Sequence, residues 1–290
     1  MNRLSLNTAT CKYLNLEQCV EASVRGGLRY IGPWRDRVQE VGAERAAKII
    51  ADAGLTVSTL CRGGFITPRH PDQIATTMAD NRRAIEEAAT IGAPELVMVV
   101  GGLPASFPPD QAADSDAGDK DLVAARQRVA DRLAELVPYA RQHGVRLALE
   151  PMHPLFTADR GVLTTIGQSL DIAQDFAPEE VGVVIDTYHV WWDPDLAAAI
   201  ARAGTENRIS SYQICDWILP LAANTLNSRG MMGDGYIDFP TITTWVAQAG
   251  YSGPIEVEIF NEAIWAQPGS TTVQQMSERY AQLVVPSLVG

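Results

Sequence analysis

Lysine is scarce in this sequence, and its scarcity limits what the protein can bind. Only Lys12, Lys48 and Lys120 occur among 290 residues, and acidic residues outnumber basic ones by 35 to 23, giving a formal net charge of −12. Nucleic acids and anionic membranes are bound chiefly through clustered lysine and arginine. We therefore expect neither nucleic acid nor a membrane among the partners.

Cysteine and long apolar segments are sparse as well. The four cysteines form no C-x-x-C pair, which predicts no disulfide framework. No apolar run approaches the roughly 18 residues of a membrane-spanning helix, and the first seven residues lack the apolar core and cleavage site of a signal peptide. We therefore expect a cytoplasmic protein, with Cys61 and Cys215 buried because both lie in apolar runs.

Apolar strand-like runs alternate with amphipathic helical patterns along the whole chain. Eight strands and eight helices in strict alternation are typical of a (β/α)8 TIM barrel, and we expect residues 1–290 to form one such domain. An open doubly wound sheet is the alternative, but no G-x-G-x-x-G motif opens the first helix. The expected strands are 3–8, 29–33, 56–61, 95–100, 146–151, 182–187, 209–215 and 254–260, and the expected helices are 15–26, 42–53, 72–92, 119–143, 166–176, 194–203, 238–249 and 270–284.

Glycines recur where an expected helix ends and the next strand begins. This position favours glycine because a helix often ends on a residue in the left-handed conformation. The glycines concerned are Gly26, Gly27, Gly54, Gly92, Gly144, Gly204 and Gly250.

Four of the expected strands carry a polar side chain near the end: Glu150, Asp186, Gln213 and, on the last strand, Glu256 or Glu258. Parallel strands bring their carboxyl ends to one face of a barrel, where active sites are built. These side chains would form an oxygen-rich pocket with three negative charges, which needs a divalent cation or protons to neutralise it. By strand periodicity the two glutamates of the last strand point the same way, and we favour Glu258 because it lies nearer the carboxyl end.

Each of these residues also has a plain structural explanation. Asp186 suits the N-cap of a helix, and His189 could be a histidine satisfied within the core. Gln213 could serve as a hydrogen-bond partner alone, and Asp216 could cap a turn rather than orient Arg229 or a ligand. The shared position of the set at consecutive strand ends favours the functional interpretation.

Two expected loops are longer than the usual connection. Residues 101–118 follow the fourth strand, and residues 217–238 follow the seventh strand. Both follow strands, so we expect both on the catalytic face, where they could act as a lid or a partner-binding surface. The first loop is equally consistent with an ordinary surface loop.

These residues resemble the xylose-isomerase-like TIM barrels of the sugar phosphate isomerase/epimerase family, most densely from Leu147 to Glu262. The resemblance implies one divalent metal held by residues of strands five to eight. Glu150, Asp186 and Glu258 match three of the ligands. Gln213 stands where the family usually has histidine.

The same resemblance implies roles for other residues. His189 matches the substrate-side histidine of a D-x-x-H motif, and Arg229 resembles an arginine that contacts substrate oxygens. With Gln213 the ligand set consists of oxygen atoms, which favours Mn²⁺ or Mg²⁺ over zinc, with Co²⁺ as a further candidate. Family members often pair through loops of the catalytic face, so a homo-oligomer is expected, and an accessory subunit at the barrel mouth remains open. A DNA-repair endonuclease branch needs many histidines, whereas this chain has four.

A divalent ion in such a site would chelate a hydroxy-ketone and stabilise a metal-bound cis-enediolate. Glu150 and Glu258 could then act as acid and base, with His189, His153 and Arg229 placing or protonating oxygens. Return of the proton to the other face gives epimerisation, and its return to the neighbouring carbon gives isomerisation. Loss of a leaving group from the same intermediate gives elimination.

Tryptophans that follow the expected strands suggest a stacking surface for a sugar or an aglycone. Trp34, Trp191 and Trp217 are the substrate-binding candidates, together with Asp216. Only Arg62-Gly63-Gly64 offers an obvious phosphate site, which favours a non-phosphorylated sugar, keto-sugar or glycoside.

The sequence therefore predicts a metal-dependent sugar isomerase or epimerase. One alternative is a lyase that dehydrates a keto-cyclitol or cleaves a 3-keto-glycoside or C-glycoside. Another is a non-catalytic barrel that binds a sugar or serves as a subunit of a complex.

Overall fold

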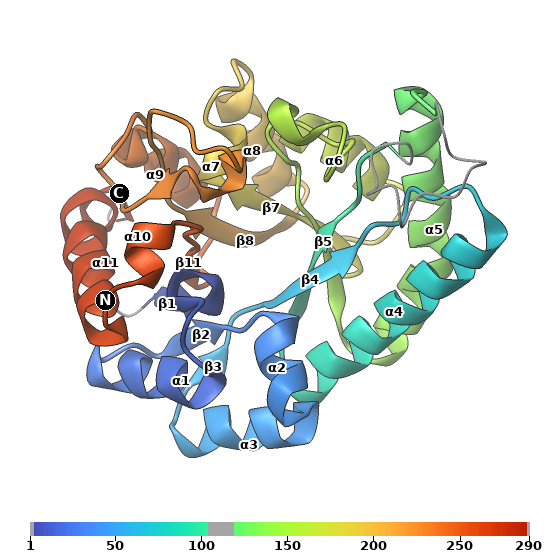
Figure 1. The fold of residues 1–290 in the computed structure, drawn as a ribbon. Coiled ribbons are helices and arrows are strands. Elements are labelled where there is room, and N and C mark those ends of the chain that lie inside the picture. The colour runs from blue at the N-terminus through green and yellow to red at the C-terminus, as the bar shows by residue number, and fades with distance from the viewer. Residues whose placement is uncertain (1–2, 104–118, 289–290) are drawn as a thin grey trace.

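The computed structural model describes residues 3–103 and 119–288. Helices surround a central set of strands in the ring of a (β/α)8 TIM barrel (Figure 1). The expected fold class is therefore confirmed. The strands are β1 (Leu4–Asn7), β2 (Tyr30–Gly32), β3 (Thr56–Val57), β4 (Leu60–Gly64), β5 (Glu95–Val99), β6 (Arg146–Leu149), β7 (Val181–Asp186), β8 (Ile209–Ile214), β9 (Asp216–Trp217), β10 (Arg229–Gly230) and β11 (Ile255–Val257).

The helices follow the expected ranges closely and include three short additions. The α-helices are α1 (Leu16–Arg25), α2 (Arg35–Val41), α3 (Ala43–Asp52), α4 (Pro71–Thr90), α5 (Leu122–Gln142), α6 (Ile166–Ala173), α7 (Thr187–Val190), α8 (Leu196–Thr205), α9 (Phe239–Gln248), α10 (Glu262–Trp265) and α11 (Gly269–Leu283). The 3₁₀ helices are η1 (Thr8–Cys11), η4 (Pro154–Phe156), η5 (Thr225–Asn227) and η6 (Val285–Leu288). The unexpected α-helices, α2, α7 and α10, each begin within five residues of a strand end.

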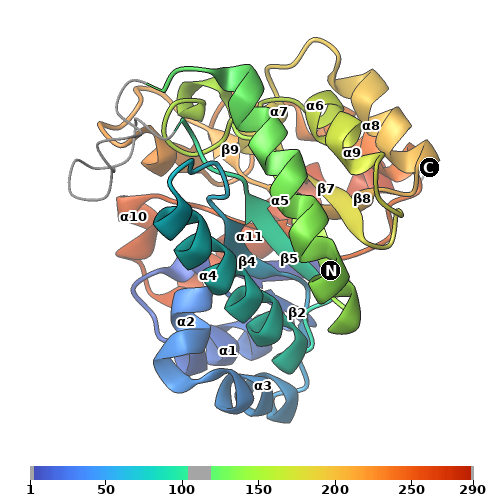
Figure 2. The same cartoon turned by 90° about the vertical axis from the view of Figure 1, so that its right-hand side faces the viewer.

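Nine strands pair in parallel in the order β3-β2-β1-β11-β8-β7-β6-β5-β4. The ends of this sheet meet where Trp34, just after β2, forms a parallel bridge with Cys61 of β4, and the N–H of Cys61 donates to Pro33 O at 3.1 Å. Turning the molecule by 90° shows α4 and α5 side by side outside β4 and β5 (Figure 2). The barrel places the carboxyl ends of all these strands on one face.

The third expected strand, 56–61, is divided into β3 and β4. On the β2 side, Ser58 N–H donates to Ile31 O and Cys61 N–H donates to Pro33 O. The step from residue 58 to 61 therefore spans three residues, whereas the facing step from residue 31 to 33 spans two. On the β5 side, Cys61 pairs with Val97 and Gly63 pairs with Met98, which leaves Arg62 without a partner. The extra residue is a β-bulge, a feature that redirects side chains and that strand periodicity does not reveal.

Side-chain caps explain where several helices begin. Asn15 and Gln18 form a reciprocal capping box at α1, while Asp121, Thr165 and Asp238 each accept a backbone N–H at the start of α5, α6 and α9. These contacts satisfy N–H groups that lack a partner within the helix.

Most of the glycines expected to end a helix in the left-handed conformation do so, but Gly204 does not. Gly27, Gly54, Gly92, Gly144 and Gly250 have positive φ angles, as expected. Gly204 lies inside α8, and Asn207, with φ of 55°, takes the left-handed position instead. Gly204 is needed for packing, because a Cβ there would lie 2.4 Å from Ala249 O.

The four cysteines are buried and free, including Cys61 and Cys215 as expected. Residues 104–118 of the first long loop lie outside the described part of the chain. In the second loop, β9 and β10 form a short antiparallel pair. Among the described residues, no helix is long and apolar enough to span a membrane.

Candidate active site

The polar residues predicted at the strand ends converge on one face of the barrel. Glu150 directly follows β6, Asp186 ends β7, and Glu258 directly follows β11. Gln213 pairs in register with Asp186 on one side and with Glu256 on the other. Because these strands are parallel neighbours, their carboxyl ends bring these side chains to the same end of the barrel.

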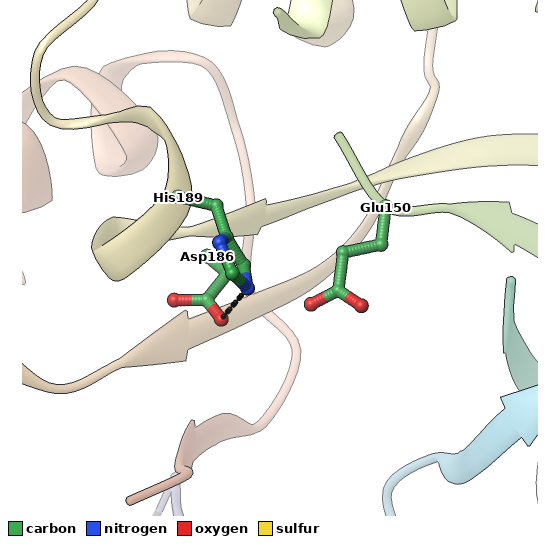
Figure 3. Close-up of side chains that lie close together, drawn as sticks. All are labelled: Glu150, Asp186 and His189. Atoms are coloured by element: carbon green, nitrogen blue, oxygen red, sulfur yellow. Dashed lines mark ion pairs between the residues drawn. The ribbon is translucent and has the colours of Figure 1, made fainter. Parts of the chain in front are cut away.

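Glu150, Asp186 and His189 form a buried cluster at this face. One ligand-type atom from each lies within 4.8 Å of the other two. The carboxylate of Glu150 points toward Asp186 and His189 (Figure 3), and His189 Nε2 lies 3.7 Å from Asp186 Oδ2. Asp186 also caps α7, since its Oδ1 accepts the N–H of Tyr188 at 2.8 Å. The cap and the cluster therefore use different oxygens of the same carboxylate.

Arg229 places a positive charge among the carboxylates. Its Nη1 donates to Asp186 Oδ2 at 2.9 Å and to Glu258 Oε2 at 3.0 Å, and the side chain is only 2% exposed. Burial opposes the charge, but Asp186 and Glu258 raise the pKa of Arg229 above its ordinary value, so the guanidinium stays protonated. With Glu150 included, three carboxylates and one guanidinium carry a formal charge of −2.

The two glutamates have contrasting surroundings. Glu258 Oε2 accepts from Arg229, and its Oε1 accepts from Trp34 Nε1 at 3.0 Å. Glu150 accepts no side-chain or backbone hydrogen bond from the described residues. Burial, followed by the charges of Glu258 and Asp186, raises the pKa of Glu150 well above its ordinary value. Burial also raises the pKa of Glu258, but Arg229 and the Trp34 hydrogen bond oppose the rise. Without a ligand, Glu150, which has no such donors, is therefore the carboxyl that holds a proton more readily.

Asp186 titrates higher than an ordinary aspartate despite its arginine partner. Burial raises its pKa to about 6, the charge of Glu258 adds to this, and Arg229 opposes it. The negative charge of the buried carboxylates can therefore be neutralised either by protons or by a bound cation.

His189 is held as a neutral ring whose Nδ1 accepts a hydrogen bond. The backbone N–H of His153 lies 3.1 Å from this Nδ1, and a backbone N–H can only donate. Burial, reinforced by Arg229, lowers the pKa of His189 well below its ordinary value. The single proton of the neutral imidazole is therefore on Nε2, the nitrogen that faces the cluster.

This tautomer makes His189 a donor toward the site. Its Nε2 lies 3.0 Å from Arg229 Nη2, which is also a donor. A ligand oxygen that accepts from both groups would relieve this contact between two donors. The geometry thus suits His189 to holding a substrate oxygen more than to ligating a cation.

His153, a predicted substrate-binding residue, lies behind His189. Its Nδ1 accepts from Leu155 N–H at 3.2 Å, its ring lies 4.6 Å from that of Trp217, and burial lowers its pKa to about 4. The structure gives it the role of orienting His189 through its backbone.

Gln213 is completely buried and does not line the cavity that Glu150 and Glu258 line. Its Nε2 faces Glu256 Oε2 at 3.4 Å, whereas its Oε1 has no hydrogen-bond partner among the described residues. Glu256 is held by Asn7 Nδ2 at 3.0 Å and by Thr59 Oγ1 at 2.8 Å. Glu256 thus fixes which end of the Gln213 amide is the donor and leaves an amide oxygen free.

Asp216, predicted to bind substrate or to cap a turn, organises the long loop after β8. Its two oxygens accept the backbone N–H groups of Trp217, Gly233, Gly235 and Ile237 at 2.8–3.0 Å. The side chain is fully buried. These contacts fold the segment that carries Arg229, so the geometry favours the capping explanation.

The predicted tryptophans divide into two groups. Trp34 lines the central cavity beside Glu258 and Phe260. Trp217 stacks on Tyr188 at 4.8 Å and lies 5.8 Å from Trp191, in an aromatic layer behind the histidines. Of the three tryptophans, the structure therefore brings Trp34 to the cavity.

A cavity of about 240 Å³ opens over these groups at the carboxyl ends of the strands. Glu258, predicted to face the site, lines it, whereas Glu256 does not. Polar residues outside the predicted set also line it, and they come from segments far apart in sequence: Lys12, Arg62, Arg160, Asn224 and Asn227. The polar lining residues are Lys12, Arg62, Glu150, Arg160, His189, Asn224, Asn227, Arg229 and Glu258.

Known proteins with similar sequences are sugar isomerases and epimerases. The chain is 26% identical to a ketose 3-epimerase from Arthrobacter globiformis over 227 residues, which are 77% of this chain and 70% of the epimerase. It is 23% identical to an inosose isomerase from Halalkalibacterium halodurans over 153 residues, which are 52% of each protein. The chain thus spans about half the length of the inosose isomerase that it matches.

Solved structures share the fold over nearly the whole chain. A crystal structure of a protein from Sinorhizobium meliloti 1021 matches with a TM-score of 0.89 and 42% identity, over 97% of this chain and 98% of that protein. The IolI protein, whose crystal structure contains a zinc atom, matches with a TM-score of 0.81 and 20% identity, over 99% of this chain and 100% of that one. A family model for the xylose isomerase-like TIM barrel matches residues 18–281, and the chain belongs to this family.

Proposed function

We propose that the protein is a divalent-metal-dependent sugar isomerase or epimerase that acts on a ketose or keto-sugar. The observation that carries this proposal is the pair of glutamates in one cavity. Both carboxyls have raised pKa values because they are buried, but Glu150 has no hydrogen-bond donor among the described residues, whereas Arg229 and Trp34 donate to Glu258 and favour its ionised form. An acid and a base facing one cavity are what proton transfer at a carbon next to a carbonyl requires.

The residues present fit a divalent cation. When all three carboxylates are ionised, Glu150, Asp186 and Glu258 together with Arg229 leave a charge of −2, and Gln213 adds a buried amide oxygen without a hydrogen-bond partner among the described residues. We propose Glu150, Asp186, Gln213 and Glu258 as the residues that hold the ion. Because these donors are oxygens, Mn²⁺ or Mg²⁺ is favoured, with Co²⁺ as a further candidate. Such an ion would polarise the carbonyl and lower the pKa of the adjacent C–H.

The protein's own residues provide the proton transfers. Glu258, whose ionised form is stabilised by Arg229 and Trp34, is suited to remove the proton beside the carbonyl. Glu150, whose pKa is raised, is suited to take up a proton and to return it to the opposite face, or to the neighbouring carbon. His189 Nε2–H and the Arg229 guanidinium are both donors, and they stabilise negative charge that develops on the substrate oxygen as the enediolate forms.

The remaining predictions from the sequence belong to the same proposal. They are one domain over residues 1–290, a cytoplasmic location, a homo-oligomer, and room for an accessory subunit at the barrel mouth. A sugar or glycoside remains the expected class of substrate.

The test combines metal content with proton exchange. The purified protein is analysed for bound metal and then incubated in deuterated water with a panel of ketoses and 3-keto-glycosides. One Mn²⁺ or Mg²⁺ per chain with deuterium beside the carbonyl would support the proposal. A product lighter by water or by an aglycone would replace isomerase by lyase. No metal and no exchange after added Mn²⁺ would favour a non-catalytic barrel.

A further inference from the structure

Arg62 enters the central cavity because it is the extra residue of a β-bulge. Its neighbours Cys61 and Gly63 pair with consecutive residues of β5, which leaves Arg62 outside the ladder. A bulge removes a side chain from the in-and-out alternation of a strand and redirects it, often beside an active site. Here the redirected side chain lines the cavity that also contains Glu150.

The fold holds this bulge firmly from the outside. The buried side chain of Asn81 in α4 accepts the N–H of Gly64 at 2.6 Å and donates to the Gly64 carbonyl at 2.8 Å. A Cβ at Gly63 would lie 2.8 Å from both Asn81 Oδ1 and Met98 Sδ. Because Asn81 already accepts the Gly64 N–H, that N–H is not available to bind a phosphate. The Gly63-Gly64 backbone instead positions Arg62.

The Arg62 guanidinium has no carboxylate partner among the described residues. It lies 4.2 Å from the centroid of the Phe65 ring, which leaves its N–H groups for other acceptors. Burial and then the charge of Arg160 lower its pKa to about 10, so it is still protonated at neutral pH. A cation kept beside another cation is unfavourable unless an anion joins them.

Arg160, from the loop that follows η4, supplies the second cation. It lines the same cavity, and its Nε lies 3.3 Å from Asp159 Oδ2 in an ion pair that lacks the geometry of a hydrogen bond. The two Nη groups take no part in this contact. The cavity is lined by four basic residues, Lys12, Arg62, Arg160 and Arg229, and by two acidic ones, Glu150 and Glu258, in a chain whose net charge is −12.

We propose that Arg62 and Arg160 bind an anionic group, a carboxylate or a phosphate, carried by the substrate at a carbon away from the reacting carbonyl. The inference rests on the proposed function and narrows its substrate class from a neutral to an anionic keto-sugar. Guanidinium groups suit both anions because they donate parallel N–H groups to two oxygens. Arg229 is committed to Asp186 and Glu258, so the anion falls to the other two arginines.

Equilibrium binding tests the anion site without requiring turnover. Calorimetric titration of the metal-free protein compares sorbitol with sorbitol 6-phosphate and with glucuronate. We expect one or both anionic probes to bind about 10- to 100-fold more tightly than sorbitol, as charged hydrogen bonds allow. The preferred probe identifies the anion as phosphate or carboxylate.

Arg62→Gln and Arg160→Gln should each reduce this preference for the anionic probe by about 10-fold or more. Arg83→Gln, at an exposed position of α4, is the matched control and should keep the wild-type preference. Equal binding of sorbitol and both anions would overturn the inference, as would an unchanged preference in both variants, because the anion would then lie elsewhere.

Failure of the proposed function gives a different result from failure of this inference. A protein without metal or deuterium exchange that still binds the anionic probes through Arg62 and Arg160 retains the anion site and loses the isomerase. A protein that incorporates deuterium equally into neutral and anionic ketoses, and binds sorbitol as tightly as the anionic probes, supports the isomerase and contradicts the anion site.

Discussion

Arg229 Nη1 lies 2.9 Å from Asp186 Oδ2 inside the barrel, and the same nitrogen reaches Glu258 at 3.0 Å. One guanidinium thus neutralises part of a carboxylate cluster that is proposed to hold a cation. The residual charge of −2 matches a divalent ion, so Arg229 and the metal are complementary rather than competing sources of positive charge. This division leads to the first prediction.

Arg229→Met should make the stability of the protein depend strongly on metal. Breaking a buried ion pair leaves uncompensated charge and costs about 3 to 5 kcal/mol. We expect urea unfolding in chelator to show this loss, and saturating Mn²⁺ to recover more stability in the variant than in the wild type. Arg279→Met, which removes a surface pair with Asp234, should cost less than about 1 kcal/mol. Equal losses in the two variants would contradict the buried role of Arg229.

Glu150→Gln should abolish turnover while the fold stays intact. The amide keeps the shape of the side chain but can neither carry the exchanged proton nor supply a charge. We expect the rate of deuterium exchange to fall by at least about 100-fold, the usual contribution of a general acid or base. Glu135→Gln, on the exposed face of α5, is the control. Circular dichroism checks the fold, and wild-type rates in the variant would eliminate Glu150 as a catalytic residue.

Glu256→Gln should weaken metal binding although Glu256 does not line the cavity over the carboxylates. The carboxylate accepts from Gln213 Nε2, and an amide in its place no longer fixes which end of Gln213 is the oxygen. Outer partners of metal ligands typically contribute about 10- to 100-fold in affinity. Titration with Mn²⁺ measures the effect, with Gln213→Leu as the reference for complete loss of the ligand. Unchanged affinity in both variants would remove Gln213 from the ligand set.

Asp216→Asn should loosen the segment from Arg229 to Ile237. An amide cannot accept from four backbone N–H groups as the carboxylate does, and we expect a loss of about 2 kcal/mol. Chymotrypsin should cleave faster at the exposed Tyr236. Asp238→Asn, at the N-cap of α9, is the control, and similar cleavage in both variants would argue against a specific role of Asp216.

Glu95, at the opposite end of the barrel, should make stability fall as the pH rises. Burial raises its pKa from 4.5 to about 7, although Arg146 lies 3.6 Å away. Between these values the folded protein retains a proton that the unfolded chain has released, so folding becomes less favourable with increasing pH.

Glu95→Gln should remove this dependence. Relative to the variant, the wild type should lose about 2 kcal/mol between pH 5 and pH 8. Urea unfolding of both proteins at the two pH values measures it. A constant difference between them would show that Glu95 titrates normally.

The barrel itself could be predicted from the sequence because its signals are local. Runs such as Leu147-Ala148-Leu149 reveal a strand, and the polar residue that follows reveals the strand end. The bulge at Arg62 escaped prediction because it depends on how Asn81 of α4 binds the backbone of β4. The left-handed turn at Asn207 escaped because the packing of Gly204 against Ala249 competes with its use as a helix stop.

The site was only partly predictable for a related reason. Glu150, Asp186 and Glu258 lie at strand ends, which the barrel places together whatever the loops do. Lys12 and Arg160 reach the cavity from loops, and no periodic pattern relates a loop residue to a strand end. The contact between Gln213 and Glu256 also depends on strand register, which is fixed by pairing across the sheet.

The junction between Trp34 and Cys61, where the sheet closes into a barrel, also affects how the barrel opens locally. Cys61 N–H to Pro33 O is the bond beside the bulge, whereas β7 and β8 pair along most of their length. The Cys61 amide hydrogen, which bridges β4 to the residue after β2, should therefore exchange with solvent through a smaller local opening than the amide hydrogens shared between β7 and β8. Because Arg62 lies beside this junction, a ligand bound to Arg62 should stabilise the contact between β2 and β4. We therefore expect ligand binding to slow amide hydrogen exchange along β2 and β4.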